Sequence, residues 1–134
     1  MWTIYGQDHL LQQLEPSLRQ RRLSHAYLLC GPPHVGKMAL AINLAQAVNC
    51  LDGPGVPCGS CIQCTRIALG HHTDVRTLAP GQGEEGRSAR TMIGINEIKE
   101  ILRRVNLNPY EGSSSVVILD GAESMSDEAA NALL

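Results

Sequence analysis

One loop constrains the fold of this 134-residue chain more than any other segment: Gly31-Pro32-Pro33-His34-Val35-Gly36-Lys37-Met38. It fits the pattern G-x-x-x-x-G-K, in which glycines let successive backbone N–H groups turn inward and bind phosphate oxygens at the start of a helix. The apolar run 26–30 precedes the loop, and Leu40, Leu44 and Val48 follow it at four-residue spacing. Because strand, loop and helix occur in the order that the motif requires, the sequence predicts a P-loop fold.

The loop lacks one side chain that metal-dependent nucleotide hydrolysis normally uses. The motif ends in Ser or Thr, whose hydroxyl holds Mg²⁺, but this chain has Met38, whose thioether is a weak acceptor. Lys37 is kept and would reach the β- and γ-phosphates. The sequence leaves open whether ATP or ADP binds and whether Mg²⁺ accompanies it. The alternative is a Gly-Pro turn that packs a helix on a sheet and binds nothing.

A second apolar run, 116–119, ends in Asp120. In a parallel sheet this aspartate would lie at the carboxyl end of a strand beside the phosphate site, where such residues help to hold Mg²⁺. The next residue is Gly121, which has no side chain to activate water. The two residues Met38 and Gly121 therefore predict a site that hydrolyses ATP poorly or not at all. The alternative is a buried strand whose aspartate opens a turn.

The remaining segments predict an α/β architecture with three layers. Two further amphipathic helices are indicated, one across residues 7–21 and one from residue 95 to the Asn108-Pro109 pair. Pro16 lies inside the first of them and is expected to interrupt it. A strand is predicted at 74–78, and residues 80–90 are typical of a loop. Strands that alternate with helices favour a mostly parallel sheet.

Four of the five cysteines lie close together in the pattern C-x7-C-x2-C-x2-C. Short C-x2-C loops place two thiolates on one side of a tetrahedral zinc ion, and four protein ligands leave no position for a reacting water. The sequence therefore predicts a structural zinc site, and the alternative is four free thiols packed as small apolar side chains. The predicted ligands are Cys50, Cys58, Cys61 and Cys64. Cys30 is expected to be a core thiol. His71 and His72 follow the knuckle and could compete as ligands, but they are expected to be surface residues.

Composition and charge exclude several classes of protein. The hydrophobic content of 43% is that of a globular chain, and the net charge of −2 provides no basic field that could hold DNA by itself. No apolar run reaches the roughly 20 residues that cross a bilayer, and no signal-peptide layout is present, so we expect a cytoplasmic protein without membrane contacts. The apolar helical pattern at 129–134 predicts a fragment that is cut inside a helix.

Together these motifs resemble the clamp-loader subunits of bacterial DNA polymerase III. The cysteine insertion directly after the P-loop helix is the most specific match, and the resemblance covers nearly the whole chain. The other matching segments are Ile4-Tyr5-Gly6-Gln7, Leu23-Ser24-His25-Ala26-Tyr27-Leu28-Leu29, Ile95-Asn96-Glu97-Ile98-Lys99 and Ala129-Ala130-Asn131-Ala132-Leu133-Leu134.

The resemblance implies that residues 1–134 are the N-terminal part of an AAA+ P-loop domain with a zinc knuckle at 50–64. It implies a pentameric loader, shared with gamma/tau and delta subunits, that opens the sliding clamp and closes it around primed DNA. The chain would then contact DNA through the assembled complex. The family's sheet has a strand that would follow residue 134, so the chain is expected to supply three of its five strands.

The resemblance also divides the possible functions into two. Gamma/tau subunits carry working ATP sites, usually with a glutamate after the strand-end aspartate, whereas delta-prime subunits often have altered sites and serve as a stator. Met38 and Gly121 place this chain nearer the delta-prime type. We therefore expect a largely non-hydrolysing stator with weak or absent ATPase activity of its own. The alternative is a gamma/tau-type motor that hydrolyses ATP.

Overall fold

The computed structural model describes residues 1–80 and 93–133, which form two compact units. The first unit contains Met1–His72 and Gly112–Ser114, and the second contains Thr73–Glu111 and Ser115–Leu134. The loop predicted at 80–90 lies outside the described residues except for Pro80. Within the described ranges, the structure has no helix of the length and apolar character that a bilayer crossing needs.

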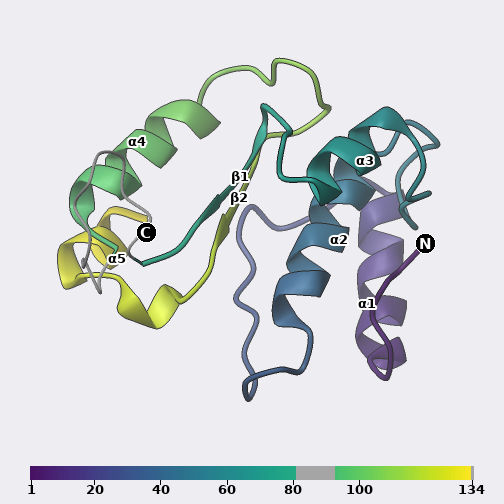
Figure 1. Cartoon of the computed structure of the whole chain (residues 1–134), viewed down its shortest axis with the longest axis horizontal. Coiled ribbons are helices and arrows are strands. Elements are labelled where there is room, and N and C mark those ends of the chain that lie inside the picture. The colour runs from purple at the N-terminus through teal and green to yellow at the C-terminus, as the bar shows by residue number, and fades with distance from the viewer. Residues whose placement is uncertain (81–92, 134) are drawn as a thin grey trace. The chain divides into compact units, whose positions relative to one another are not determined.

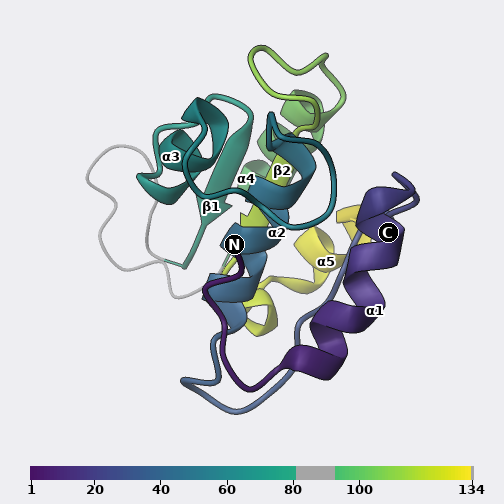
Figure 2. The ribbon, with the colours of Figure 1, turned by 90° about the vertical axis from the view of Figure 1, so that its right-hand side faces the viewer.

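The first unit is built on two neighbouring helices, α1 (Asp8–Arg19) and α2 (Lys37–Asn49), drawn in purple and blue (Figures 1 and 2). Ile4, Leu11 and Leu40 form their shared apolar core. The prediction of a helix near 7–21 is confirmed, but α1 continues through Pro16. Leu18 lies beyond the proline and is 1% exposed, so burial of this leucine favours the last turn despite the lost backbone hydrogen bond.

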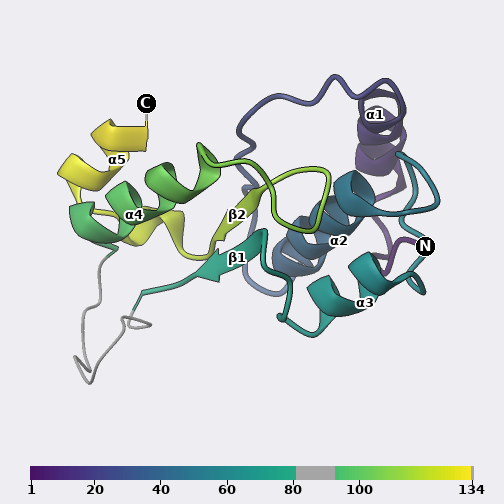
Figure 3. The same ribbon diagram turned by 90° about the horizontal axis from the view of Figure 1, so that it is seen from above.

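The helix predicted from the leucine spacing after the glycine loop is confirmed as α2. Its most buried residues are smaller or more polar than that spacing suggests, because Ala45, Ala47 and Asn49 are at most 1% exposed. The short helix α3 (Ile62–Ala68) packs beside α2 (Figure 3). It was not predicted, because it has only seven residues and its start is fixed by a cysteine cap.

The second unit holds a two-stranded parallel sheet, β1 (Val75–Leu78) and β2 (Val116–Leu119), with Val75 opposite Val116 and Leu78 opposite Leu119. Both predicted strands are confirmed, and so is the small parallel sheet. The connection between the strands includes α4 (Ile95–Val105), which confirms the predicted helix, although it ends before the Asn108-Pro109 pair. A chain of this length between parallel strands is what a crossover requires.

The core of the second unit lies between α4, the sheet and α5 (Asp127–Leu133). Ile98 and Ala129 are both 0% exposed and lie on α4 and α5, which pack on each other (Figures 1 and 3). A 3-10 turn, Ala122–Ser124, leads from β2 to α5. The apolar pattern is therefore helical as predicted over its described residues, 129–133, with its apolar side packed on α4.

The strand predicted at 26–30 is wrong. These residues have no regular secondary structure, and the described part of the first unit contains no strand that could pair with them. Leu28 is 76% exposed and Cys30 is exposed, so the prediction of Cys30 as a core thiol is also wrong. An apolar run becomes a buried parallel strand only when neighbours satisfy its backbone and cover both faces. The structure thus supplies two of the three strands expected.

Candidate functional site

The glycine loop is a tight exposed turn in the first unit that leads directly into α2. Two of its residues have left-handed backbone conformations, His34 with φ 63° and Gly36 with φ 94°. Gly36 is the N-cap of α2, and its carbonyl oxygen accepts from Leu40 N–H at 2.9 Å. Such reversals between left-handed and right-handed residues turn backbone N–H groups toward one side, which is how anion-binding loops form.

Lys37 joins the two ends of this loop. Its Nζ donates a hydrogen bond to the carbonyl oxygen of Gly31 at 2.7 Å. The bond is exposed, so an incoming anion could compete for the ammonium at little cost. Met38 is the second residue of α2 and is half-buried. The loop therefore places an exposed turn and a cation at the start of a helix. Both features favour binding of a phosphate group.

Asp120 lies in the second unit, directly after β2. Its N–H donates to the carbonyl oxygen of Leu78 at 2.8 Å, so the aspartate continues the hydrogen bonding of the sheet. Because the eight loop residues belong to the first unit, binding of nucleotide by the loop and Asp120 together stays a prediction.

The residue after Asp120 has a backbone that suits glycine. Gly121 has φ 74°, and a Cβ built on it would lie 3.3 Å from Cδ of Pro80. A residue with a side chain would be strained in this left-handed conformation, whatever space surrounds it. The absence of a glutamate here therefore agrees with the local conformation of the chain.

The four predicted zinc ligands do come together. The Sγ atoms of Cys50, Cys58, Cys61 and Cys64 all lie within 4.8 Å of one another. Cys50 is the C-cap of α2, Cys61 is the N-cap of α3, and Cys64 lies in the first turn of α3. The ends of two helices and the loop between them thus position the four thiols, which confirms that these residues form one cluster.

Backbone N–H groups point at the cluster sulfurs. Cys61 N–H and Ser60 N–H donate to Cys58 Sγ at 3.2 and 3.4 Å, and Cys64 N–H donates to Cys61 Sγ at 3.4 Å. Cys58 N–H in turn donates to Cys50 Sγ at 3.4 Å. Such bonds stabilise negative charge on sulfur, so the knuckle backbone is arranged for thiolates rather than for neutral thiols.

The four thiols differ in acidity. Hydrogen bonds from the backbone of Ser60 and Cys61 lower the pKa of Cys58 to about 6. Burial raises the pKa of Cys64 to about 12 and also raises the pKa of Cys50. A metal that binds all four as thiolates must therefore displace protons from the buried pair, so its affinity would fall as the pH falls.

The spacing of the four sulfurs is close to that of a tetrahedral metal site. Zinc–sulfur bonds of about 2.3 Å place the sulfurs of a tetrahedral site roughly 3.8 Å apart. The upper limit of 4.8 Å between the cluster sulfurs exceeds that separation by about 1 Å, which small side-chain rotations can remove. Cys64 is 0% exposed and Cys50 is 9% exposed, so one side of the cluster is closed to water. This cluster could hold a metal ion.

Sequence reasoning missed several buried polar residues of the first unit. Asn43 and Gln46 are buried on α2 and hydrogen-bonded to each other, with Asn43 Nδ2 donating to Gln46 Oε1 at 2.8 Å. His72, predicted to lie on the surface, is buried, and its Nε2 contacts Oε1 of Gln63 on α3; His71 is exposed. Polar side chains in helices usually face water, so nothing in their spacing indicated burial.

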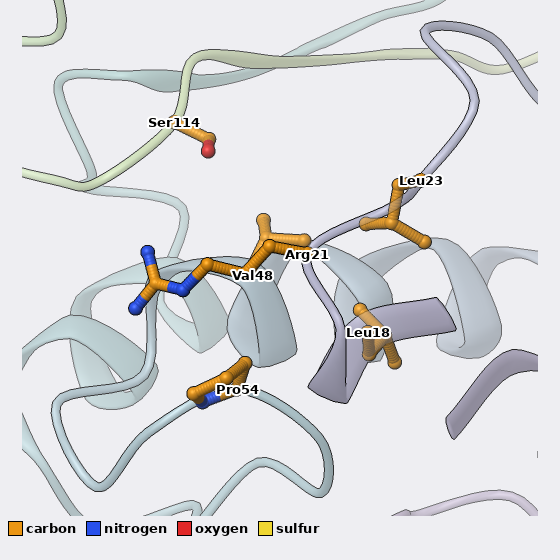
Figure 4. A pocket seen from close by; sticks show the side chains of 6 residues that line it. All are labelled: Leu18, Arg21, Leu23, Val48, Pro54 and Ser114. Carbon is orange, nitrogen blue, oxygen red and sulfur yellow. The ribbon is translucent and has the colours of Figure 1, made fainter. Parts of the chain in front are cut away.

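The first unit also contains a pocket of about 260 Å³ (Figure 4). Four of its six lining residues are apolar, and the turn that ends α1 contributes one guanidinium group. None of its lining residues belongs to the glycine loop or to the four cysteines of the cluster. The lining residues are Leu18, Arg21, Leu23, Val48, Pro54 and Ser114.

Comparison with known proteins places these features in one family. The family model described as "DNA polymerase III, delta subunit" matches residues 6–134. DNA polymerase III subunit tau of Bacillus subtilis is 35% identical over 132 residues, which are 98% of this chain and 22% of that protein. Subunit delta' of the same organism is 33% identical over 128 residues, which are 96% of this chain and 36% of that protein.

A third relative, subunit tau of Escherichia coli, is 31% identical over 132 residues, 98% of this chain and 19% of that protein. The chain thus spans between about a fifth and about a third of the length of these relatives. Relatives named tau and relatives named delta' are similar to it to nearly the same degree.

Proposed function

Because the chain belongs to the DNA polymerase III delta-subunit family, the clamp-loader family that its motifs resemble, we propose that it is a delta-prime-type subunit for DNA replication. It would help to load the sliding clamp onto primed DNA, largely as a non-hydrolysing stator. Its partners would be the gamma/tau and delta subunits and the clamp, and it would contact DNA through the assembled complex. It would act in the cytoplasm, and its ATPase activity would be weak or absent.

One observation carries this proposal: the chain keeps the glycine turn and the lysine of the P-loop motif but lacks the side chains that would hold magnesium and activate water. The turn and its lysine are in place at the start of α2. Met38 stands where a hydroxyl would hold Mg²⁺, and Gly121 follows Asp120 in a left-handed conformation that disfavours a glutamate. We therefore propose ATP or ADP as ligand of the loop and Asp120, within the N-terminal part of an AAA+ domain, without efficient turnover.

We further propose that the cysteine cluster holds a structural zinc ion, in a knuckle at 50–64. The clustered sulfurs, the N–H groups directed at them and the buried pair of ligands support this assignment. Four thiolate ligands leave no open position, so zinc would supply stability and not chemistry.

A gamma/tau-type motor is the second candidate, favoured by the 35% identity to a tau subunit. The two functions differ in what magnesium does at the loop. In a motor, Mg²⁺ is held by the hydroxyl that follows the P-loop lysine, and nucleotide binding depends on it. In the stator proposed here, Met38 removes that ligand.

ADP affinity is therefore expected to change little between Mg²⁺-containing and Mg²⁺-free buffer, as measured by calorimetric titration of the purified protein. Restoring the hydroxyl with Met38→Thr is expected to make Mg²⁺ improve ADP affinity by about tenfold, the effect of one added charge-assisted contact. Ala41→Ser, which adds a hydroxyl one turn further along α2, is the control and should show no gain. Strong Mg²⁺ dependence in the unaltered chain would favour the motor.

A further inference from the structure

A chain of side-chain amides connects the cysteine cluster with the N-terminal segment. Gln46 Nε2 donates to the carbonyl oxygen of Cys64 at 3.0 Å, and Asn43 Nδ2 donates to Gln46 Oε1 at 2.8 Å. At the far end, Thr3 N–H and Thr3 Oγ1 both donate to Asn43 Oδ1, at 2.8 and 3.0 Å. These three residues, Thr3, Asn43 and Gln46, are called the amide relay below.

The relay fixes the backbone of a cluster residue. Cys64 N–H donates to Cys61 Sγ, and Cys64 carbonyl oxygen accepts from Gln46, so both polar groups of this residue's backbone are tied. Cys64 is 0% exposed, and its Sγ is one of the four sulfurs of the cluster. Groups that orient a metal ligand from behind raise the affinity of the site, because the ligand no longer has to be ordered when the metal binds.

The burial of the relay argues for a specific role. Asn43 is 2% exposed and Gln46 is 6% exposed. Burying an amide costs free energy unless its donors and acceptors are paired, and apolar residues could fill the same positions on α2 without that cost. The amides bond to groups outside their own helix, on α3 and on the N-terminal segment, so they set the relative positions of three elements.

The other end of the relay, Thr3, lies in the segment that packs on the first turn of α2. Thr3 precedes Ile4, which packs with Leu40 in the first turn of α2. Trp2, the only tryptophan of the chain, donates from Nε1 to Glu15 Oε1 at 2.8 Å. The segment Trp2–Ile4 is thus held against α1 and α2 by apolar packing and by two sets of hydrogen bonds, one of which ends on the relay.

We propose that Gln46 and Asn43 are positioning residues of the zinc centre, which couple zinc binding to the docking of the N-terminal segment against the first turn of α2. The proposal rests on the proposed zinc site. Zinc fixes Cys64, Cys64 fixes Gln46, and Gln46 holds Asn43 in the orientation that accepts from Thr3. By linkage, a docked segment raises zinc affinity as much as zinc favours docking.

The test uses Co²⁺ in place of zinc, because Co²⁺–thiolate absorption reports the metal site, while Trp2 fluorescence reports the segment. Gln46→Met removes the amide at similar size and is expected to weaken Co²⁺ affinity about tenfold in chelator competition. In the unaltered chain, metal removal should shift Trp2 emission to the red and increase its quenching by acrylamide. Metal-loaded Gln46→Met should already show that shift, and so should metal-loaded Asn43→Leu.

Two control variants separate positioning from stability. Gln12→Met changes an exposed glutamine on α1 and should leave both signals unaltered. Ile67→Ala removes buried apolar contacts of α3 and leaves the amides of the relay unchanged. It is expected to lower the melting temperature, while Trp2 emission in the metal-loaded protein stays unshifted.

Three results would overturn the inference, and they are distinguishable. Unaltered Co²⁺ affinity and unaltered Trp2 emission in Gln46→Met would contradict the positioning role of the relay but not the zinc site. An equal shift of Trp2 emission in metal-loaded Ile67→Ala would mean that the effect reflects a general loss of stability and not the relay. Absence of Co²⁺–thiolate absorption in the unaltered chain would contradict the zinc site and, with it, the role of the relay.

Discussion

Cys64→Ser is expected to abolish tight zinc binding and to unfold the first unit at a much lower temperature. Serine is nearly the same size, but its hydroxyl is a poor zinc ligand and would replace the most buried of the four sulfurs. Zinc that binds only the folded state contributes about 4 kcal/mol when free zinc exceeds its Kd about 1,000-fold. We expect a loss of that order, measured as the free energy of unfolding at a fixed concentration of free zinc.

Cys30→Ser provides the matched control. Cys30 is exposed and lies outside the cluster, so the same substitution there should change neither the zinc content nor the melting temperature. Equal zinc content and equal melting temperatures for the two variants would contradict the zinc assignment.

Lys37→Ala is expected to weaken ADP binding about 100-fold while the protein stays folded. Loss of a charged hydrogen-bond donor to phosphate costs about 3 kcal/mol in binding, which corresponds to that factor. The lysine's bond to Gly31 is exposed, so its removal should change the free energy of unfolding by no more than about 0.5 kcal/mol. Titration calorimetry measures the affinity, and thermal melting verifies the fold.

The control for this prediction is Lys99→Ala, which removes an exposed lysine on α4 in the second unit. It should bind ADP as the unaltered chain does. If both lysine variants bound ADP with unchanged affinity, the glycine loop would be a structural turn and the proposed nucleotide site would be wrong.

The sequence predicted those parts of the fold that local patterns determine. Leu40, Leu44 and Val48 recur at helical spacing and lie on α2. The run at 116–119 is apolar, with three β-branched residues, and forms β2. The cysteine cluster was also predictable, because ligand spacing of two residues limits where the thiols can point.

The remaining features depend on partners that spacing does not reveal. The run at 26–30 has the composition of a buried strand, but a strand also needs a neighbour, which the described part of its unit does not provide. Helix α3 begins because a cysteine sulfur caps it, a use of cysteine that helix-start rules do not include. Gln46 carries an amide of the kind that usually faces water, and its burial depends on the hydrogen bond to the carbonyl of Cys64, eighteen residues away.

ATP turnover by the purified protein, with Mg²⁺ present and Lys37→Ala as reference, tests the central claim most directly. We predict that both proteins release phosphate at the same background rate, since the chain has neither the hydroxyl after Lys37 nor a glutamate after Asp120. Mg²⁺-dependent turnover that disappears in Lys37→Ala would contradict the stator and would identify the chain as a motor subunit.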